Sequence, residues 1–514
     1  MTINQTMNIS RESMNNYQHA LAVVSQNLAN MNVDGYIKLR ADFATNPTYS
    51  LGNNVYSNIR GLNGASISQI TSYANNAAAN SARGANSQAQ YYYTLGSIMD
   101  QLGEISNELG DDGLQASFKE FFSAAQNLSA NPTDPSARRI YLESAQSVAM
   151  KFNSIAGSLD NLQEQLVGDW QHPATIENSD IYMSVQDFNK GLERLAELNK
   201  QITIQGAENS TGLINERENL LKDLSAYMDL NVEYNKNGTV DVKTGDIKLV
   251  AGGEQQVKLN AVAGDKDTPA IIEIQKMDGT TMISNANDEI SGGQIGAILD
   301  IVNTSDDGFI TISGMRSKID EMANTFATEV NNVQTFVDGD MQAMALGTDP
   351  VTGEQILVPS TEPIFNLDNP ITADSISVNQ NVIDNPNLIA TARVDTSVAG
   401  WEKNVGNSDN IVATAQLRDK NTMSTYGGAN NVTFEGFLTY FSGEVGLQQS
   451  DIAGKFETAN VVNESAQTNY QSITGVNLDE ELADMIKFQR GYEASARMFN
   501  VANEIYQVLV ALGE

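Results

Sequence analysis

The sequence predicts a mainly α protein with β insertions, an α+β chain whose discontinuous domains are nested inside one another. Three observations lead to this expectation. Apolar residues recur every three or four positions at both ends of the chain, as they do along a coiled-coil seam. Similar helical stripes fill much of the interior. Two interior segments, 231–290 and 338–397, instead carry the short β-branched runs and turn residues that are typical of strands.

Length and composition set wide limits on this architecture. The 514 residues are too many for a single hydrophobic core, so we expect two to four domains. The 30 basic and 64 acidic side chains give a formal net charge of −34, which disfavours nucleic acid and anionic lipid as partners. The absence of cysteine excludes disulfides and thiolate chemistry and is compatible with export. We find neither a membrane span nor a cleaved secretory signal, and therefore expect no membrane insertion and either a cytoplasmic location or signal-less export.

The first predicted element is a helix of about 45 Å that ends at Asp34-Gly35, where glycine can adopt the left-handed conformation that closes a helix. The assembly positions on its seam are Met14, Tyr17, Leu21, Val24, Leu28 and Met31. The polar face is formed mostly by amides, including Asn27 and Asn30, and residues 1–33 contain few ionised side chains. An ordinary core helix would show the same seam. An uncharged polar face, however, favours close packing against identical copies, where rings of like charge would repel one another.

Long helices are also predicted for the interior. Apolar stripes run from Leu114 to Leu128, Leu142 to Leu166, Phe188 to Ile202, Met315 to Val333 and Phe434 to Ile452. Asp134 is expected to cap the second of these helices, with Pro135 in its first position. In the first β segment, the NKNG stretch at 235–238 predicts a turn within a meander, and in the second, ISV at 376–378 is a short β-branched run.

The C-terminal segment repeats the pattern of the N-terminal helix. Asn477 is expected to be the N-cap, with Glu480 in the capping-box position. The predicted assembly positions are Leu482, Met485, Phe488, Tyr492, Phe499, Tyr506 and Leu509. Because the last turns are apolar on more than one side, this helix requires several neighbours to bury it.

These elements predict a nested domain organisation with the β insertions at the end far from the termini. The expected terminal coiled-coil domain comprises 1–35 and 477–514, and the expected helical bundle comprises 36–230, 291–337 and 398–476. The segments 231–290 and 338–397 would then form one or more outer β domains.

The sequence offers no convincing catalytic, cofactor or metal site. The only histidines, His19 and His172, stand outside any zinc-binding motif. The acidic pairs at 265/267 and 338/340 lack the spacing of a calcium loop, and the glycine pairs lack the context of a phosphate-binding loop. We therefore predict a chain that is not an enzyme and needs no cofactor.

Two terminal stretches carry a family resemblance. Residues 20–36, ALAVVSQNLANMNVDGY, resemble the N-terminal signature of the bacterial flagellar axial proteins, roughly S-x-N-[LI]-A-N-x-N-T-x-G-Y. The matching signature positions include Asn27, Asn30, Asn32, Gly35 and Tyr36. Residues 476–505 are similar to the C-terminal signature of the same superfamily. Within it, the interior segments at 118–153 and 292–301 resemble the hook-associated protein 1 family, which forms the hook–filament junction.

The resemblance implies a structural role in the bacterial flagellum. Members of this family are exported through the flagellar type III apparatus and form a ring, a homo-oligomer that joins hook to filament and adapts their different mechanics. The implied partners are copies of the chain itself, the flagellar hook protein, hook-associated protein 3 and a cytoplasmic export chaperone that binds the C-terminal helix. The implied location is extracellular. We further hypothesise that the amide face, Asn27 and Asn30 included, lines the channel through which unfolded cargo passes.

Two alternatives stay open at this point. The flagellar hook protein shares both terminal signatures but should be dominated by β domains, which the helical stripes from Leu114 to Met228 disfavour. An exported enzyme or effector belongs to a different class and would need a convergent catalytic site.

Overall fold

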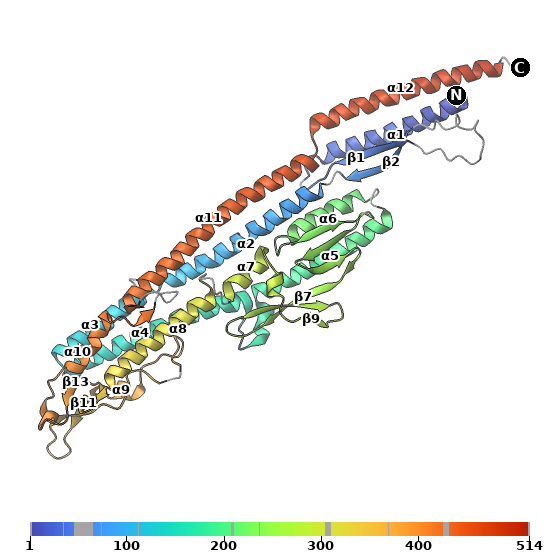
Figure 1. Ribbon diagram of the computed structural model, residues 1–514. Coiled ribbons are helices and arrows are strands. Elements are labelled where there is room, and N and C mark those ends of the chain that lie inside the picture. Colours follow the sequence, from blue (N-terminus) through green and yellow to red (C-terminus); the bar gives the residue numbers. More distant parts are fainter. Residues whose placement is uncertain are drawn as a thin grey trace.

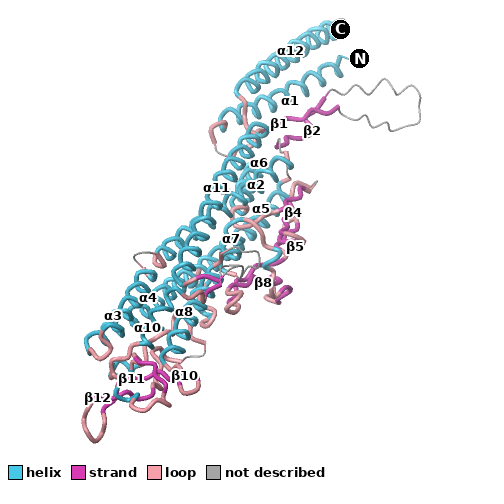
Figure 2. Tube along the Cα trace, turned by 60° about the vertical axis from the view of Figure 1, so that its left-hand side comes forward, coloured by secondary structure: helices cyan, strands magenta, loops and turns pink. Residues whose placement is uncertain are grey.

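The structure is a computed structural model that describes residues 3–33, 35–45, 65–72, 75–110, 113–206, 210–235, 237–303, 310–367, 370–424 and 431–511. The molecule is elongated (Figure 1). Both terminal helices lie together at one end, long helices form the middle, and a small sheet lies at the opposite end (Figures 1 and 2). The predicted fold class, mainly α with β insertions, is confirmed.

The described residues form twelve α-helices and fifteen strands. The helices are α1 (Ile3–Asn30), α2 (Asn76–Asn107), α3 (Leu114–Ala130), α4 (Pro135–Val167), α5 (Asp180–Gln205), α6 (Thr211–Leu224), α7 (Gly293–Val302), α8 (Ile312–Gln334), α9 (Gln380–Asp384), α10 (Asp409–Gln416), α11 (Phe434–Thr474) and α12 (Leu478–Ala511). The strands are β1 (Leu39–Thr45), β2 (Ala65–Ser72), β3 (Asn231–Tyr234), β4 (Val240–Thr244), β5 (Ile247–Ala251), β6 (Glu254–Gln255), β7 (Val257–Ala263), β8 (Ala270–Lys276), β9 (Thr281–Ile283), β10 (Val337–Asp338), β11 (Met341–Thr348), β12 (Gln355–Pro359), β13 (Ala392–Asp395), β14 (Met423–Ser424) and β15 (Asn431–Val432).

The predicted apolar stripes form the core of the bundle. The stripes of α3, α4, α5, α8 and α11 are buried almost throughout. At the centre, the Phe326 ring lies 4.9 Å from that of Phe118 and 5.7 Å from that of Phe434, centroid to centroid. Burying each such ring contributes roughly 1.5–3 kcal/mol, so helices far apart in the sequence are joined by a few aromatic contacts. The cap of α4 is also as expected, because the Asp134 side chain accepts from the Ser136 N–H.

The first β insertion lies against the side of the bundle. Strands β3–β6 form one antiparallel sheet and β7–β9 another, and β7 packs against α5. Their buried residues are continuous with the helical core. The expected turn is present, with Gly238 at φ 85° and the Asn235 N–H donating to the Thr239 carbonyl. The expectation that both β insertions lie at the far end is therefore wrong for this one, because its apolar face completes the core beside α5.

The second β insertion lies at the end far from the termini (Figure 2). There β11 pairs with β10, β12 and β13, and Met344, Leu346, Leu357, Ala392 and Val394 form a small separate core. The ISV run at 376–378 does not form the expected strand and makes only one isolated bridge, between Val378 and Phe365. The reason is that side chains hydrogen-bond the preceding loop, where Asn153 donates to the Ala373 carbonyl and the Ala373 N–H donates to Asp320.

A buried arginine attaches this far end to the bundle. Arg138, on α4, is fully buried, and its guanidinium donates to the carbonyls of Pro132 and Ile389 and to the Thr391 hydroxyl. Burial lowers its pKa to about 10. Because its hydrogen-bond partners are carbonyl and hydroxyl oxygens, this cation holds two loops together by solvating their polar groups.

The stripes did not reveal α2 or the β1–β2 hairpin. Helix α2 lies beside α11 over much of its length, and its buried N-terminal residues are mostly small, among them Ala78, Ala82 and Ala89. Small residues give a weak apolar period yet allow two helices to approach closely. The antiparallel β1–β2 pair packs against α1 and extends the terminal helix pair.

Candidate functional site: the terminal helix pair and its junction with the bundle

The two terminal helices pack along each other in the single chain. Helices α1 and α12 lie side by side (Figure 1), and the centre of their contact is formed by the buried Ala20, Val24 and Phe488. The predicted positions Tyr17, Leu21, Leu28 and Met485 are partly buried around this centre. The seam is therefore used within one subunit, and the structure brings these predicted residues together.

An aromatic cluster fixes the spacing of the pair. The rings of Tyr17, Phe488 and Phe43 lie 5.9 to 6.4 Å apart, centroid to centroid, with Phe43 supplied by β1. Gly491 on α12 faces this cluster, and a Cβ there would lie only 2.6 Å from the Tyr17 Cζ. The helices can thus approach closely at this point, because a glycine leaves room for the Tyr17 ring.

Other predicted assembly positions are less well covered within one subunit, although the Tyr492 hydroxyl accepts from the Gln18 side-chain amide on α1 at 3.5 Å. Met14, Tyr492 and Phe499 are half-buried, whereas Met31, Leu482, Tyr506 and Leu509 are 41–53 % exposed. The exposed apolar face of α12 is formed by Leu478, Leu482, Ile486, Met498, Val501, Ile505, Tyr506, Val508, Leu509 and Val510. One subunit thus leaves much of α12 uncovered, and the assembly role of these residues stays a prediction.

Asn27 connects the two terminal helices with the first strand. Its amide nitrogen donates to the Leu39 carbonyl at 2.9 Å and to the Glu481 carboxylate at 3.1 Å. Its oxygen accepts from the Leu39 N–H at 2.9 Å and from the Tyr36 hydroxyl at 3.0 Å. The expectation that Asn27 belongs to an exposed amide face is wrong. The side chain is 1 % exposed, because its donors and acceptors complement a buried backbone corner.

The remaining signature residues shape the same corner. Helix α1 ends at Asn30, earlier than expected, and a turn precedes Gly35. Gly35 therefore does not cap the helix directly. It has φ 71°, and a Cβ there would collide with the Asn219 side chain on α6. Asn30 bonds its own helix at the Gln26 carbonyl, and Asn32 is exposed. The predicted stop at Asp34 lies outside the described residues.

The start of α12 completes the corner from the other side. Asn477 caps the helix by accepting from the Asp479 N–H at 2.9 Å, as predicted. Glu480 does not return the capping-box bond but forms an ion pair with Lys38 at 3.3 Å. Burial is the main cause that raises the pKa of Glu481, and the Asn27 hydrogen bond acts against it. The corner thus holds a carboxylate that is partly desolvated.

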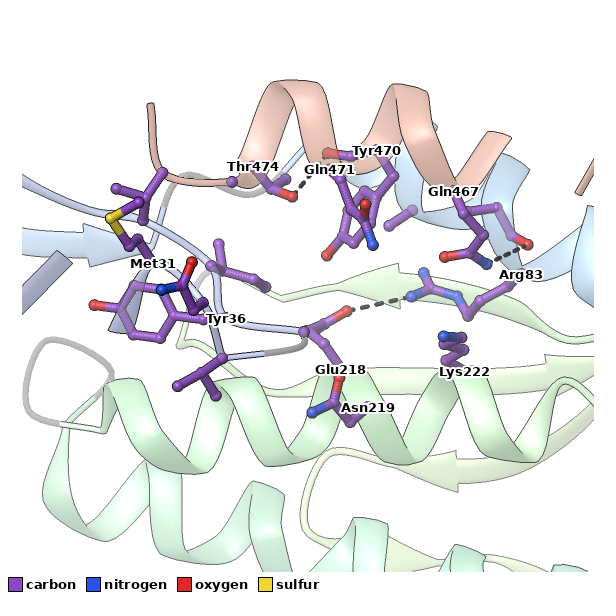
Figure 3. Close-up of a pocket in the computed structure, with 18 residues that line it drawn as sticks. Met31, Tyr36, Arg83, Glu218, Asn219, Lys222, Gln467, Tyr470, Gln471 and Thr474 are labelled. Atoms are coloured by element: carbon purple, nitrogen blue, oxygen red, sulfur yellow. Dashed lines mark hydrogen bonds and ion pairs between the residues drawn. The ribbon is translucent and has the colours of Figure 1, made fainter. Parts of the chain in front are cut away.

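A cavity of about 430 Å³ lies where the helix pair meets the bundle (Figure 3). Its walls come from the corner at 31–37 and from α2, α6 and α11, and they include Arg83, Lys222 and Tyr470. We call it the junction cavity. Sequence reasoning missed it, because its lining comes from four segments that are far apart in the chain.

Next to the junction cavity lies a buried cluster of charged groups. Glu218 accepts from Arg83 Nη1 at 3.2 Å and from the Tyr234 hydroxyl at 2.6 Å with one oxygen. It accepts from Arg217 Nε and Nη2, at 3.1 and 2.8 Å, with the other. All three charged side chains are at most 5 % exposed. Burial is the main cause that raises the pKa of both Tyr234 and Tyr470, the latter to about 12, so both hydroxyls are neutral at physiological pH.

The structure also bears on metal ligands and membrane spans. Across the described ranges, no three histidine, aspartate or glutamate side chains are close enough to share a metal ion. In the same part of the chain, no helix is both long and apolar enough to cross a membrane.

Comparison with known families identifies three regions. Residues 99–339 match the flagellar hook-associated protein FlgK helical domain. Residues 467–512 match the C-terminal region of the flagellar basal body rod FlgEFG proteins, and residues 7–36 match the flagella basal body rod protein family. The terminal matches cover the helix pair, and the central match covers most of the bundle.

Relatives along the full length bear the same name. The chain is 27 % identical to flagellar hook-associated protein 1 of Bacillus subtilis, over 98 % of this chain and 96 % of the relative. Identity to the protein of that name from Escherichia coli is 22 %, over 98 % and 99 %. In fold, the chain is similar to the flagellar hook junction protein FlgK from Burkholderia pseudomallei. That match has a TM-score of 0.55 and 15 % identity, and it covers 76 % of this chain and 99 % of the other.

These relatives are structural flagellar proteins and not enzymes, which confirms the prediction that this chain is not an enzyme. They also favour the resemblance to the hook-associated proteins over the hook protein itself. The matches at both ends and in the centre agree on one assignment. The chain is similar over nearly its full length to the flagellar hook-associated protein 1 family and is an axial structural component of the bacterial flagellum.

Proposed function

We propose that this protein forms the ring that joins hook to filament and adapts the different mechanics of the two. In this proposal it is exported by the flagellar type III apparatus. Its neighbours are copies of itself, the hook protein on one side and hook-associated protein 3 on the other. A cytoplasmic chaperone binds the C-terminal helix before export.

The observation that carries the proposal is the exposed apolar face of α12. Within one subunit α1 covers a single side of this helix, while Val501, Ile505 and Val508 stay 49–59 % exposed. An exposed apolar stripe of this length marks a protein–protein contact. In a ring, the same face of each α12 is covered by terminal helices of neighbouring subunits.

The predicted domain division fits the same proposal. We propose an inner domain formed by 1–35 and 477–514 and a bundle formed by 36–230, 291–337 and 398–476. The segments 231–290 and 338–397 are then oriented away from the axis. The elongated shape, with both termini at one end, supports an arrangement in which the terminal helices lie innermost (Figure 1).

A deletion strain tests the junction role. Cells without this protein should keep their hooks, lack filaments and release flagellin into the medium, and the full chain should restore filaments. Restoration should fail with Ile505→Lys, because a charge within the exposed apolar face cannot be buried against a neighbour. Glu504→Lys adds a positive charge at an adjacent exposed position and serves as the matched control. Normal filaments in the deletion strain would refute the proposal.

A further inference from the structure

The junction cavity carries more positive charge than its own residues neutralise. The lining residues that are charged at neutral pH are Arg83, Lys222 and Glu218. Arg217 is not part of the lining but donates to the Glu218 carboxylate. Both Glu218 oxygens already accept hydrogen bonds from the two arginines and from Tyr234. Two buried guanidinium groups therefore share one carboxylate. This excess is notable in a chain with 64 acidic and 30 basic side chains.

Arg83 retains unused hydrogen-bonding capacity. Its Nη atoms donate hydrogen bonds to the Glu218 carboxylate, the Asn80 side-chain oxygen and the Tyr234 hydroxyl. Its Nε is buried and has no hydrogen-bond partner among the described residues. A buried donor without a partner is costly, and an uncompensated buried cation costs more. The side chain is nevertheless only 4 % exposed and forms part of the cavity wall.

Lys222 adds a second cation at the cavity. Its side chain is exposed, and its ammonium forms no ion pair within the described part of the chain. Polar side chains of α11, among them Gln467, Tyr470 and Gln471, line the opposite side (Figure 3). Arg83, from α2, and Lys222, from α6, both line this cavity (Figure 3), so a group that enters it meets a wall with two cations. Two cations surrounded by amide and hydroxyl groups form a suitable site for a carboxylate.

We propose that the junction cavity binds a carboxylate side chain, an aspartate or glutamate, from a neighbouring copy of this chain. The inference rests on the proposed ring, which places copies side by side. The net charge of −34 means that each copy presents acidic side chains. Leu478 and Leu482, exposed at the start of α12 beside the corner, offer a neighbour an apolar contact at this point. A cavity of about 430 Å³ has room for the end of such a side chain.

The proposed contact has a mechanical consequence. The cavity lies between the terminal helix pair and the bundle, where the chain crosses at 31–38 and again at 474–477. A carboxylate from a neighbour, bonded to Arg83 on α2 and Lys222 on α6, would fix the bundle against that neighbour close to this crossing. The angle between the two parts of one subunit would then depend on the position of the next.

Carbodiimide coupling tests whether a neighbour's carboxylate enters the junction cavity, because the reagent joins a lysine amine to a carboxylate in contact with it. Junctions are isolated from cells that produce a mixture of unlabelled and ¹⁵N-labelled chains, coupled and analysed by mass spectrometry. We expect Lys222 to be coupled to one acidic residue in peptide pairs of mixed label. Lys222→Arg should keep the junction but abolish the coupling. Lys222→Glu should lower junction occupancy about tenfold, whereas Lys403→Glu, the same change at an exposed site elsewhere, should not.

The outcomes distinguish a failure of the proposed carboxylate site from a failure of the proposed ring. Intact junctions in which Lys222 is coupled only within one label class, or not at all, would overturn the carboxylate site and leave the ring standing. Normal occupancy with Lys222→Glu would overturn it as well. Failure of the unmodified chain to form any junction would overturn the ring, and the carboxylate site with it.

Discussion

Asn27→Asp should open the corner between the terminal helices at neutral pH. The change keeps the side-chain oxygen that accepts from the Leu39 N–H and the Tyr36 hydroxyl, but removes both N–H donors. The Leu39 carbonyl loses its partner, at about 1 kcal/mol, and the bond to the Glu481 carboxylate is lost, at roughly 1.5–3 kcal/mol. Together these losses amount to about 3 kcal/mol, or a factor of more than one hundred in the opening equilibrium.

Two carboxylates would then face each other where an amide and a carboxylate now lie 3.1 Å apart. Such a pair shares one proton as the pH falls, and the protonated partner can donate to the other. Hydrogen exchange measured by mass spectrometry on peptides covering residues 15–40 should show about a hundredfold loss of protection at pH 7. The loss, relative to unmodified protein at the same pH, should shrink toward pH 5. Asn15→Asp is the control, the same change at an exposed position of α1. Equal protection in the two variants would refute the role of Asn27.

Three further changes test other parts of the structure. Gly35→Ala should lower the free energy of unfolding, measured with denaturant, by more than about 1 kcal/mol, because Gly35 has a positive φ and a Cβ would collide with the Asn219 side chain. Gly84→Ala on α2, where a Cβ would meet open space, should instead raise the free energy of unfolding by about 0.5–1 kcal/mol. Arg138→Met should lower the free energy of unfolding by roughly 3–5 kcal/mol, because buried carbonyls lose their hydrogen-bond donor. Arg139→Met, at the exposed neighbouring position, should change the free energy of unfolding little, and equal effects of the two changes would contradict the role of Arg138. The pKa of Glu481 is raised in the folded state, so its ionised form destabilises the helix pair above that pKa, and this destabilisation is lost as the pH falls through it. Protection of the α12 amides from hydrogen exchange should therefore rise on acidification in the unmodified protein and rise less in Glu481→Gln. Identical pH profiles in the two proteins would exclude a role of Glu481 in this pH dependence.

The helical core could be predicted from the sequence because each stripe is a local pattern. Leu114 to Leu128 and Phe188 to Ile202 need only the period of the helix to reveal which side is buried, and they are buried as expected. Helix α2 escaped detection because alanine and serine bury little area, and its position depends on α11, more than 300 residues away. The β1–β2 pair also escaped, since its partner surface is a face of α1.

The candidate site shows the same limit more sharply. The signature residues could be recognised, but their roles could not, because Asn27 is explained only by Leu39, Tyr36 and Glu481 together. Glu481 is 454 positions away in the sequence. The polar character of Asn27 suggested a solvent-facing amide, whereas three-dimensional packing makes it the most completely bonded residue of the corner. Likewise, the junction cavity is formed by Arg83, Glu218 and Tyr470, which no local pattern relates.

Packing within one subunit explains only part of the apolar pattern of α12. Phe488 packs against α1 and is buried, and Ala502 is also buried, whereas Leu482, Ile486 and Ile505 are apolar and exposed. A two-stranded contact needs one seam, so a second apolar side has no function within a single chain. Covering about ten exposed apolar side chains would bury a substantial area at roughly 25 cal/mol per Å², which is a strong drive toward association. We therefore infer that the sequence of α12 was selected for the assembled state, and that in solution the last turns beyond Val501 should exchange amide hydrogens fastest. Slow exchange there in a monodisperse monomer would mean that the single chain already satisfies this face.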